Sequence, residues 1–287
     1  MRGRHWFFLL LISFAFLGGS FFFFAGAFLS LFSHQKHSGD VAVIEILGPI
    51  FDSKEICEEI RDLKDHREVK AVILRIDSPG GSVGASQEIH DAVKLLKTHK
   101  PVVASLGSVA ASGGYYVATA ANKIISNPGT LTGSIGVRME LLNAQKLFEW
   151  ARLQPVTLKS GKFKDAGSSN RSMTGEEKKY FEGVLSQLHS QFKTAVSEDR
   201  GLTAEAVESL ADGRVFTGLE AKEKGLVDEL GSFDEAIHVA SHLAGLKGDP
   251  ELYYPSSRGE HFLESLLDGL VEKGVRHVAQ VLSAPSY

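Results

Sequence analysis

A serine within a run of small residues is the first candidate nucleophile in this chain. Ser112 lies in the run GSVAASGGYY, residues 107–116, where a helix is expected to begin at the serine itself. A serine at the start of a helix presents an exposed hydroxyl at the positive end of the helix dipole. Such a hydroxyl becomes a nucleophile for acyl transfer when a neighbouring base accepts its proton.

Two further glycine-rich loops are expected near this serine. One is DSPGGSV, residues 77–83, and the other is GTLTGSIG, residues 129–136, which contains Ser134. The adjacent glycines Gly80 and Gly81 let the backbone approach a ligand closely and turn its N–H groups outward. All three loops follow predicted strands, and ligands of open α/β sheets bind at the carboxyl ends of the strands.

No histidine base is found in or beside these loops. The chain has eleven histidines, and five of them are expected to be solvated on helices or at helix ends: His90, His99, His189, His238 and His242. There is no HExxH zinc pattern, no Walker loop and no G-x-S-x-G elbow around Ser112. The stretch SGKFKD, residues 160–165, follows a strand predicted over 155–158 and is a candidate source of a lysine base.

A lysine base makes a demand on its surroundings. A free lysine has a pKa of about 10.4 and is almost fully protonated at pH 7. A working base titrates near the operating pH, and burial in an apolar pocket lowers a lysine pKa because desolvation penalises the ammonium. We therefore expect an apolar environment around the base, with Phe163 contributing to it and the carboxylate of Asp165 turned away.

The elements that carry these loops alternate between strand and helix. Strands are predicted over 41–47, 69–76, 102–106 and 123–126, and helices over 52–66, 83–98 and from 112 onward. This alternation predicts an α/β domain with largely parallel strands and helical crossovers. The second half is more helical, with a capping box at Thr174–Glu177 that opens a helix to about residue 200. Further helices are predicted over 203–210, 232–246 and 260–282, and a strand-helix-strand unit over 213–231.

The N-terminus is strongly apolar. The segment 6–32 contains no charged residue, and as a helix it would span about 40 Å, more than the roughly 30 Å of a hydrocarbon core. Two arginines precede it, so residues 1–5 are expected in the cytoplasm. The domain beyond the 33–40 tether is then expected outside the cytoplasm. The alternative is a signal peptide cleaved after Ala27, although the apolar run continues past that residue.

Composition narrows the classes of function. The chain has 287 residues and a formal net charge of −4. It therefore lacks the excess positive charge that is typical of proteins that bind nucleic acid. Its one cysteine, Cys57, allows no intrachain disulfide and is expected to be a small buried side chain on a helix. No cofactor and no metal are expected.

Five motifs together resemble the signal peptide peptidase A family, in its short bacterial form with one anchor before one catalytic domain. They lie in the family's order within residues 41–247 and read DSPGGSV, GSVAASGGYYVA, LTGSIGV, LKSGKFKD and GRVFTGLEAKEKGLVDELG. The resemblance implies the fold that Clp protease subunits share with crotonases. It also implies a Ser-Lys serine protease that acts on hydrophobic peptides such as cleaved signal peptides. Residues 248–287 match no motif and are expected to form a helical extension.

The resemblance implies a role for each polar residue of the site. Ser112 corresponds to the family's nucleophile. Lys164, and not Lys162, corresponds to the general base because it directly precedes the aspartate of the SGxxKD stretch. Ser134 corresponds to the serine that hydrogen-bonds and orients this lysine.

The resemblance also implies an oxyanion hole and an assembly. The hole would be formed by backbone N–H groups of Gly80 or Gly81 and of Gly113. In the short forms of this family, protomers form a ring or dome, and the serine and lysine of one site come from neighbouring chains. We therefore expect a homo-oligomer with shared sites and an apolar interior that admits unfolded chains.

Two other functions stay open at this point. One is a crotonase-like acyl-CoA enzyme on the same fold, which would need an acyl-CoA pocket and usually has no membrane anchor. The other is a membrane-tethered scaffold without activity. The joint presence of Ser112, Lys164 and the glycine loops favours the protease over both.

Overall fold

The computed structural model describes residues 39–255 of the chain. The predicted anchor over 6–32, nearly all of the tether and the predicted helix over 260–282 lie outside the described residues. Within 39–255, the structure contains no helix that is both long and apolar enough to cross a membrane.

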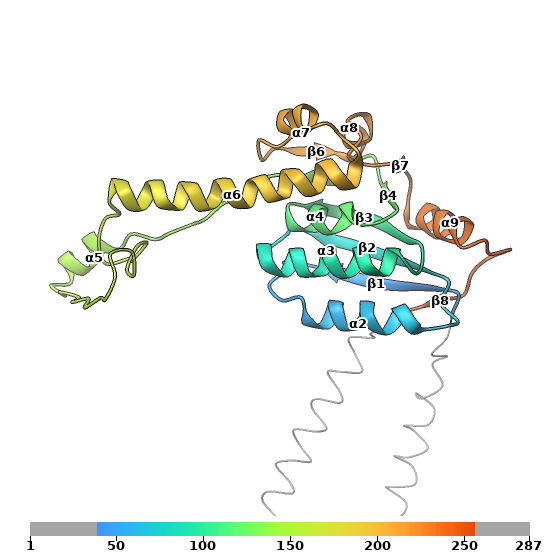
Figure 1. Ribbon diagram of the computed structural model, residues 1–287, viewed down its shortest axis with the longest axis horizontal. Coiled ribbons are helices and arrows are strands. Elements are labelled where there is room, and N and C mark those ends of the chain that lie inside the picture. The colour runs from blue at the N-terminus through green and yellow to red at the C-terminus, as the bar shows by residue number, and fades with distance from the viewer. Residues whose placement is uncertain (1–38, 256–287) are drawn as a thin grey trace, which may run out of the picture. The chain divides into compact units, whose positions relative to one another are not determined.

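The centre of the domain is a sheet of eight strands in the order β6-β5-β3-β2-β1-β8, with β4 and β7 branching from β3 (Figure 1). The strands are β1 (Val41–Leu47), β2 (Ala71–Ser78), β3 (Val102–Ala111), β4 (Lys123–Ser126), β5 (Leu131–Gly133), β6 (Val215–Thr217), β7 (Glu229–Leu230) and β8 (Leu252–Tyr253). All pairings are parallel except β5 with β6. The predicted α/β architecture with largely parallel strands is therefore confirmed.

Helices cover both faces of this sheet. They are α2 (Lys54–Asp65), α3 (Val83–Lys97), α4 (Gly113–Thr119), α5 (Gln145–Trp150), α6 (Gly175–Arg200), α7 (Ala204–Leu210), α8 (Gly218–Glu223) and α9 (Phe233–Leu243). One face of β1 and β2 packs against α2, α3 and α4 in the larger core, and the opposite face packs against α9. Cys57 on α2 is buried as predicted, and burial raises the pKa of its thiol.

Strand β3 extends five residues beyond its predicted end at 106, and this extension brings it to the nucleophile candidate. Its first part pairs with β4 through Val103–Leu106, and its last part pairs with β5 through Val109–Ala111. The hydroxyl of Thr130 donates to the carbonyl of Gly107 between the two parts. The sequence predicts a glycine-rich loop from residue 107. The small residues there lack the large apolar side chains typical of a buried strand.

Four other differences from the predicted elements concern the chain after residue 130. The strand predicted over 155–158 is wrong, since these residues are fully exposed and pair with no strand. Strand β5 and helix α5 were not predicted. Strand β8 pairs with β1, so the sheet continues past residue 247, where the catalytic domain was expected to end.

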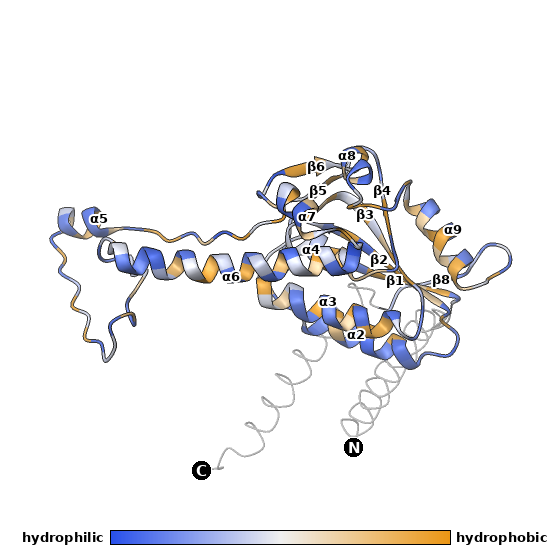
Figure 2. Ribbon diagram, turned by 45° about the horizontal axis from the view of Figure 1, so that its top comes forward, coloured by the Kyte–Doolittle hydropathy of each residue, from blue (hydrophilic) through white to orange (hydrophobic). Residues whose placement is uncertain are grey.

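Helix α6 begins as predicted, and its buried apolar residues lie only in its second half. The hydroxyl of Thr174 accepts from the N–H of Glu177, whose carboxylate accepts from the N–H of Thr174, so the capping box is confirmed. The buried apolar residues of α6 all lie in its last nine positions: Phe192, Ala195 and Val196. We call residues 137–187, which comprise α5, its flanking segments and the first half of α6, the arm. The arm lies away from the sheet in both ribbon views (Figures 1 and 2).

The arm carries many large apolar side chains that are exposed within one chain. Figure 2 colours the hydrophobic residues along its ribbon orange. They are Met139, Leu141, Leu142, Leu147, Trp150, Leu153, Val156, Leu158, Phe163, Met173 and Tyr180. An exposed apolar surface of this kind marks a site that another molecule or another chain covers.

Candidate active site

Ser112 lies at the junction between the end of β3 and the start of α4. As predicted, the helix begins here, with Ser112 as its N-cap residue. Its backbone has φ 52° and ψ −122°, a conformation that is strained for a residue with a side chain. Its N–H donates to the carbonyl of Gly133 over 2.8 Å and its carbonyl accepts from the N–H of Tyr116 over 2.8 Å. The surrounding hydrogen bonds thus hold the serine in a sharp strand-to-helix turn, which is the geometry that exposes a nucleophilic hydroxyl.

Gly80, Gly81 and Gly113 form one tight backbone cluster around this turn. A Cβ on Gly80 would lie 2.5 Å from the nitrogen of Gly113 and 2.9 Å from the Cβ of Ser112. A Cβ on Gly113 would lie 3.2 Å from the nitrogen of Gly81. The Gly80 N–H donates to Ser78 Oγ, whereas the N–H groups of Gly81 and Gly113 have no acceptor among residues 39–255. Two free donors beside a serine are what an oxyanion hole requires.

Substitution of Gly80 tests this cluster. Gly80→Ala should lower kcat by about 100-fold or more, because the new Cβ displaces the Gly113 amide and one lost oxyanion donor costs about that factor. The positive φ of 92° adds strain for alanine. Gly84→Ala is the matched control, since a Cβ there meets nothing within 4 Å. Turnover of an activated ester, with circular dichroism as a check on folding, measures the effect. Normal kcat in a folded Gly80→Ala protein would contradict the assignment.

Ser134 lies next to Ser112 across the sheet. The two serines directly follow the last paired residues of β3 and β5, Ala111 and Gly133. Ser134 also has a positive φ, 52°, and its N–H donates to the carbonyl of Arg214 over 2.9 Å. The structure therefore brings together five of the six predicted site residues: Ser112, Ser134, Gly80, Gly81 and Gly113.

A small, largely apolar pocket of about 30 Å³ opens beside Ser112. Its walls come from α3, α4, α6 and the segment after β5, and its lining residues are Gly81, Val83, Ser86, Gln87, Ser112, Gly113, Tyr116, Gly136, Val137, Leu188 and Phe192. Leu188 and Phe192 were not predicted to line this pocket. Their spacing of four residues on α6, continued by Val196, is the helical periodicity that indicates an inward face.

Lys164 is not part of this pocket within one chain. Its side chain is exposed. The residue lies in a turn of the arm, in which the backbone N–H of Lys164 donates to the carbonyl of Gly161. The first residue of α6 that lines the pocket is Leu188. It lies 14 residues after the N-cap Thr174, which is about 20 Å along the helix. The segment that joins α5 to α6 and contains Lys164 lies at that far end (Figures 1 and 2). The expected apolar surroundings of this lysine are absent from the described part of a single chain.

Side-chain ion pairs hold the Lys164 turn at the far end of α6. Arg171 donates to Asp165 over 3.0 Å and to Glu177, in the first turn of α6, over 2.9 Å. These bonds, with Lys159 as a second donor to Asp165, hold the pKa of the Asp165 carboxyl well below its usual range. Arg171 likewise lowers the pKa of Glu177 to about 2. The Asp165 carboxylate thus pairs with Arg171 and Lys159, and not with its neighbour Lys164.

The expectation that His90 is solvated is wrong. His90 is 4% exposed, and its Nε2 is 2.6 Å from a carboxylate oxygen of Asp199 on α6. The partner lies 109 positions away in the sequence, so the local pattern of α3 gave no indication of it. His90 is nevertheless not among the residues that line the Ser112 pocket, and Ser112 has no histidine base among the pocket residues.

A strained serine between a parallel sheet and a helix, with two free backbone N–H groups beside it, has the geometry of a serine hydrolase site. The model of the Clp protease family matches residues 41–130, and that of peptidase family S49 matches residues 94–247. The chain belongs to peptidase family S49 and is a serine peptidase.

Relatives with protease names support this assignment. The chain is 39% identical over 73% of its length to "Putative protease slr0021" of Synechocystis sp., and 38% identical over 69% to the chloroplastic serine protease SPPA of Arabidopsis thaliana. The matched part spans 76% of the Synechocystis protein but only 30% of the Arabidopsis protein. A solved ClpP1 mutant from Listeria monocytogenes is 18% identical, with a TM-score of 0.46 over 68% of this chain and 93% of that chain.

Proposed function

We propose that this chain is a membrane-anchored serine endopeptidase in which Ser112 is the nucleophile and Lys164 of a neighbouring subunit is the general base. The observation that carries this proposal is the strained Ser112 beside the free N–H groups of Gly81 and Gly113. The Ser112 hydroxyl would attack the peptide carbonyl carbon while its proton passes to the neutral amine of Lys164. The two amides would stabilise the oxyanion, and the lysine would return the proton to the leaving amine.

The second half of the reaction uses the same groups. Departure of the amine leaves an acyl-enzyme ester on Ser112. A water molecule then attacks the ester carbonyl and gives a proton to the lysine. The bond between the carbonyl carbon and Ser112 Oγ breaks, the lysine returns the proton to this oxygen, and the carboxylic acid product leaves. Ser134, whose backbone neighbours that of Ser112, would accept a hydrogen bond from or donate one to the lysine and so fix its direction.

The substrates that suit this site are unfolded hydrophobic peptides such as released signal peptides. The walls of the Ser112 pocket are mostly apolar, with Val83, Leu188 and Phe192 among them. The uncharged segment 6–32 would hold the enzyme at the membrane, where such peptides are released, with the catalytic domain outside the cytoplasm.

The separation of Ser112 from Lys164 supports a site shared between subunits. Within one chain Lys164 precedes the start of α6, whereas the Ser112 pocket meets α6 only at Leu188, about 14 residues further along this helix. The apolar residues of the arm are exposed within one chain and would be covered by the neighbouring copy. A homo-oligomer in which the arm of one subunit lies over the Ser112 pocket of the next would satisfy both observations.

Mixing two inactive variants tests this arrangement. Full-length Ser112→Ala and Lys164→Ala proteins, mixed in equal amounts in detergent, should regain about a quarter of wild-type activity, because that share of interfaces holds both intact residues. Subunit exchange is followed independently by energy transfer between dye-labelled subunits, and each variant alone is the control. Exchange without any return of activity would show that the two residues act within one chain.

A further inference from the structure

A buried polar cluster ties together the three helices that surround the Ser112 pocket. At its centre is Asp199 of α6, whose side chain is 3% exposed. Its carboxylate accepts from Lys94 over 3.0 Å and from the hydroxyl of Thr119 over 3.1 Å, and it is 2.6 Å from His90 Nε2. Lys94 and His90 belong to α3 and Thr119 to α4. One carboxylate thus fixes α6 to both neighbouring helices.

The carboxylate is charged in this environment. Burial alone would raise the pKa of Asp199, but the hydrogen bonds from His90 and Lys94 outweigh it and lower the pKa to about 2. A buried charge with three donors is strongly destabilised when one partner is removed, because the remaining groups stay unpaired. The geometry of the three helices is therefore sensitive to the charge of this one side chain.

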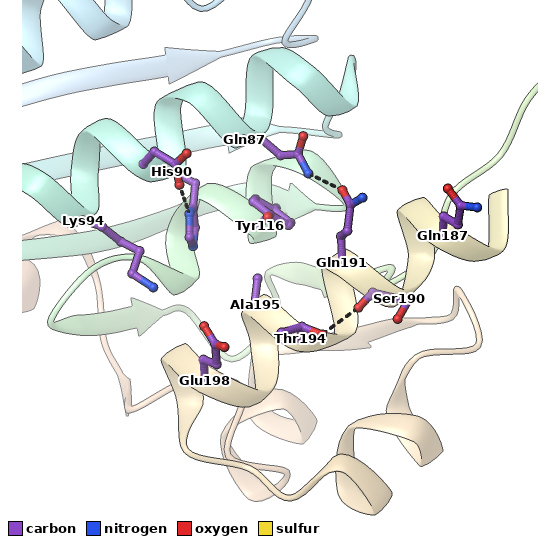
Figure 3. A pocket seen from close by; sticks show the side chains of 11 residues that line it. Gln87, His90, Lys94, Tyr116, Gln187, Ser190, Gln191, Thr194, Ala195 and Glu198 are labelled. Atoms are coloured by element: carbon purple, nitrogen blue, oxygen red, sulfur yellow. Dashed lines mark hydrogen bonds and ion pairs between the residues drawn. The ribbon is translucent and has the colours of Figure 1, made fainter. Parts of the chain in front are cut away.

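The cluster supports Tyr116, one turn of α4 after Ser112. The Tyr116 ring lies between the ring of His90, at 4.8 Å between centroids, and the ring of Phe192, at 5.0 Å. Gln87 of α3 donates to Gln191 of α6 over 2.9 Å and bridges the two helices near Tyr116 (Figure 3). His90 of α3 therefore packs against Tyr116, and Asp199 in turn holds the His90 ring in place.

Tyr116 and Gln87 form the wall between two cavities of very different size. On one side is the Ser112 pocket of about 30 Å³. On the other is a groove of about 580 Å³ between α3 and α6, which Figure 3 shows. These are the two residues that line both cavities. The Ser112 pocket is thus much the smaller of the two, so it would take a small side chain and the groove a large one.

We infer that Asp199 is a positioning residue that acts through His90 and Thr119 to hold Tyr116 as the wall of the Ser112 pocket. The wall restricts this pocket to a small side chain, such as that of alanine, beside the peptide bond that is cut. Loss of the Asp199 charge releases Tyr116, joins the pocket to the groove and admits larger side chains. The substrate in this inference rests on the proposed peptidase function. The role of Tyr116 as the wall rests on the geometry alone.

The first test compares two peptides that differ only in the residue before the cleaved bond, alanine or phenylalanine. In wild type, kcat/KM favours the alanine peptide. Asp199→Asn should raise the ratio of kcat/KM for phenylalanine over alanine by about tenfold, mainly through KM, since a methylene-sized change in a pocket is worth 10-fold or more. Glu198→Gln is the matched control, because it removes an adjacent exposed carboxylate that does not contact His90 or Thr119. A folded Asp199→Asn protein with an unchanged ratio would overturn the inference.

The second test does not depend on peptidase activity. The full-length protein is labelled with fluorotyrosine, and the Tyr116 fluorine resonance is assigned by its loss in Tyr116→Phe. Asp199→Asn should shift or broaden this resonance, and Glu198→Gln should leave it in place. If Asp199→Asn does not fold, Lys94→Met removes a donor to the carboxylate that makes no hydrogen bond to Tyr116, and it should change the resonance in the same direction. A changed resonance in a protein that cleaves neither peptide would reject the proposed function and keep the wall; an unchanged resonance would reject the wall.

Discussion

Ser112→Ala should abolish peptide hydrolysis, with a loss in kcat on the order of 10⁴-fold or more, because no other group can form the acyl-enzyme. The fold should persist, since only a half-buried hydroxyl is removed and the backbone bonds to Gly133 and Tyr116 remain. The measurement is cleavage of an unstructured hydrophobic protein, together with labelling by a fluorophosphonate probe. Both signals should disappear.

Ser108→Ala is the control for this change. Ser108 lies on the same strand, β3, and its side chain is exposed. It is not among the residues that line the Ser112 pocket, so hydrolysis and labelling should stay at the wild-type level. Turnover above about a percent of wild type in Ser112→Ala would remove this serine from its assigned role.

Lys164→Ala should be about as damaging as Ser112→Ala. A serine hydroxyl without a base is a weak nucleophile, and residues that act as one unit have effects that do not add. The double variant should therefore be no less active than Ser112→Ala alone. Activity is measured on the assembled, full-length protein, because in the proposed site the lysine comes from the neighbouring subunit.

Lys162→Ala is the matched control, two residues away in the same turn. The Lys162 ammonium pairs with Glu176 over 2.6 Å at an exposed position of the arm, and exposed pairs of this kind contribute little to stability. Its replacement should have a mild effect. An essential Lys162 with a dispensable Lys164 would mean that the base had been assigned to the wrong lysine of the SGKFKD stretch.

The position of the site could be predicted from the sequence because local chemistry determines it. The glycine-rich stretches at 77–83 and 107–116 include the carboxyl ends of β2 and β3, and the stretch at 129–136 follows β4 and includes β5. The carboxyl ends of parallel strands lie at one edge of a sheet. The helix start at Ser112 and the capping box at Thr174 depend on a few adjacent residues, and both are confirmed.

Features that depend on distant partners could not be predicted in this way. His90 lies on a helix that has an exposed face, and only the approach of Asp199 from α6 explains its burial. The residues 155–158 have strand-forming side chains, but the described part of the chain offers no strand beside them. Strand β5 is three residues long and is stabilised by its pairing with β3 and β6, which no local pattern shows.

The pairing of β8 with β1 has a consequence for the order in which the domain folds. The N–H of Val41 donates to the carbonyl of Glu251, and the N–H of Glu251 donates to the carboxylate of Asp40. These contacts join positions about 210 residues apart, so the last strand can close the sheet only after nearly the whole domain has been synthesised. Until then β1 presents an open edge, which is a template for pairing with another chain. A chain truncated after residue 247 would keep that edge permanently and should be prone to aggregation.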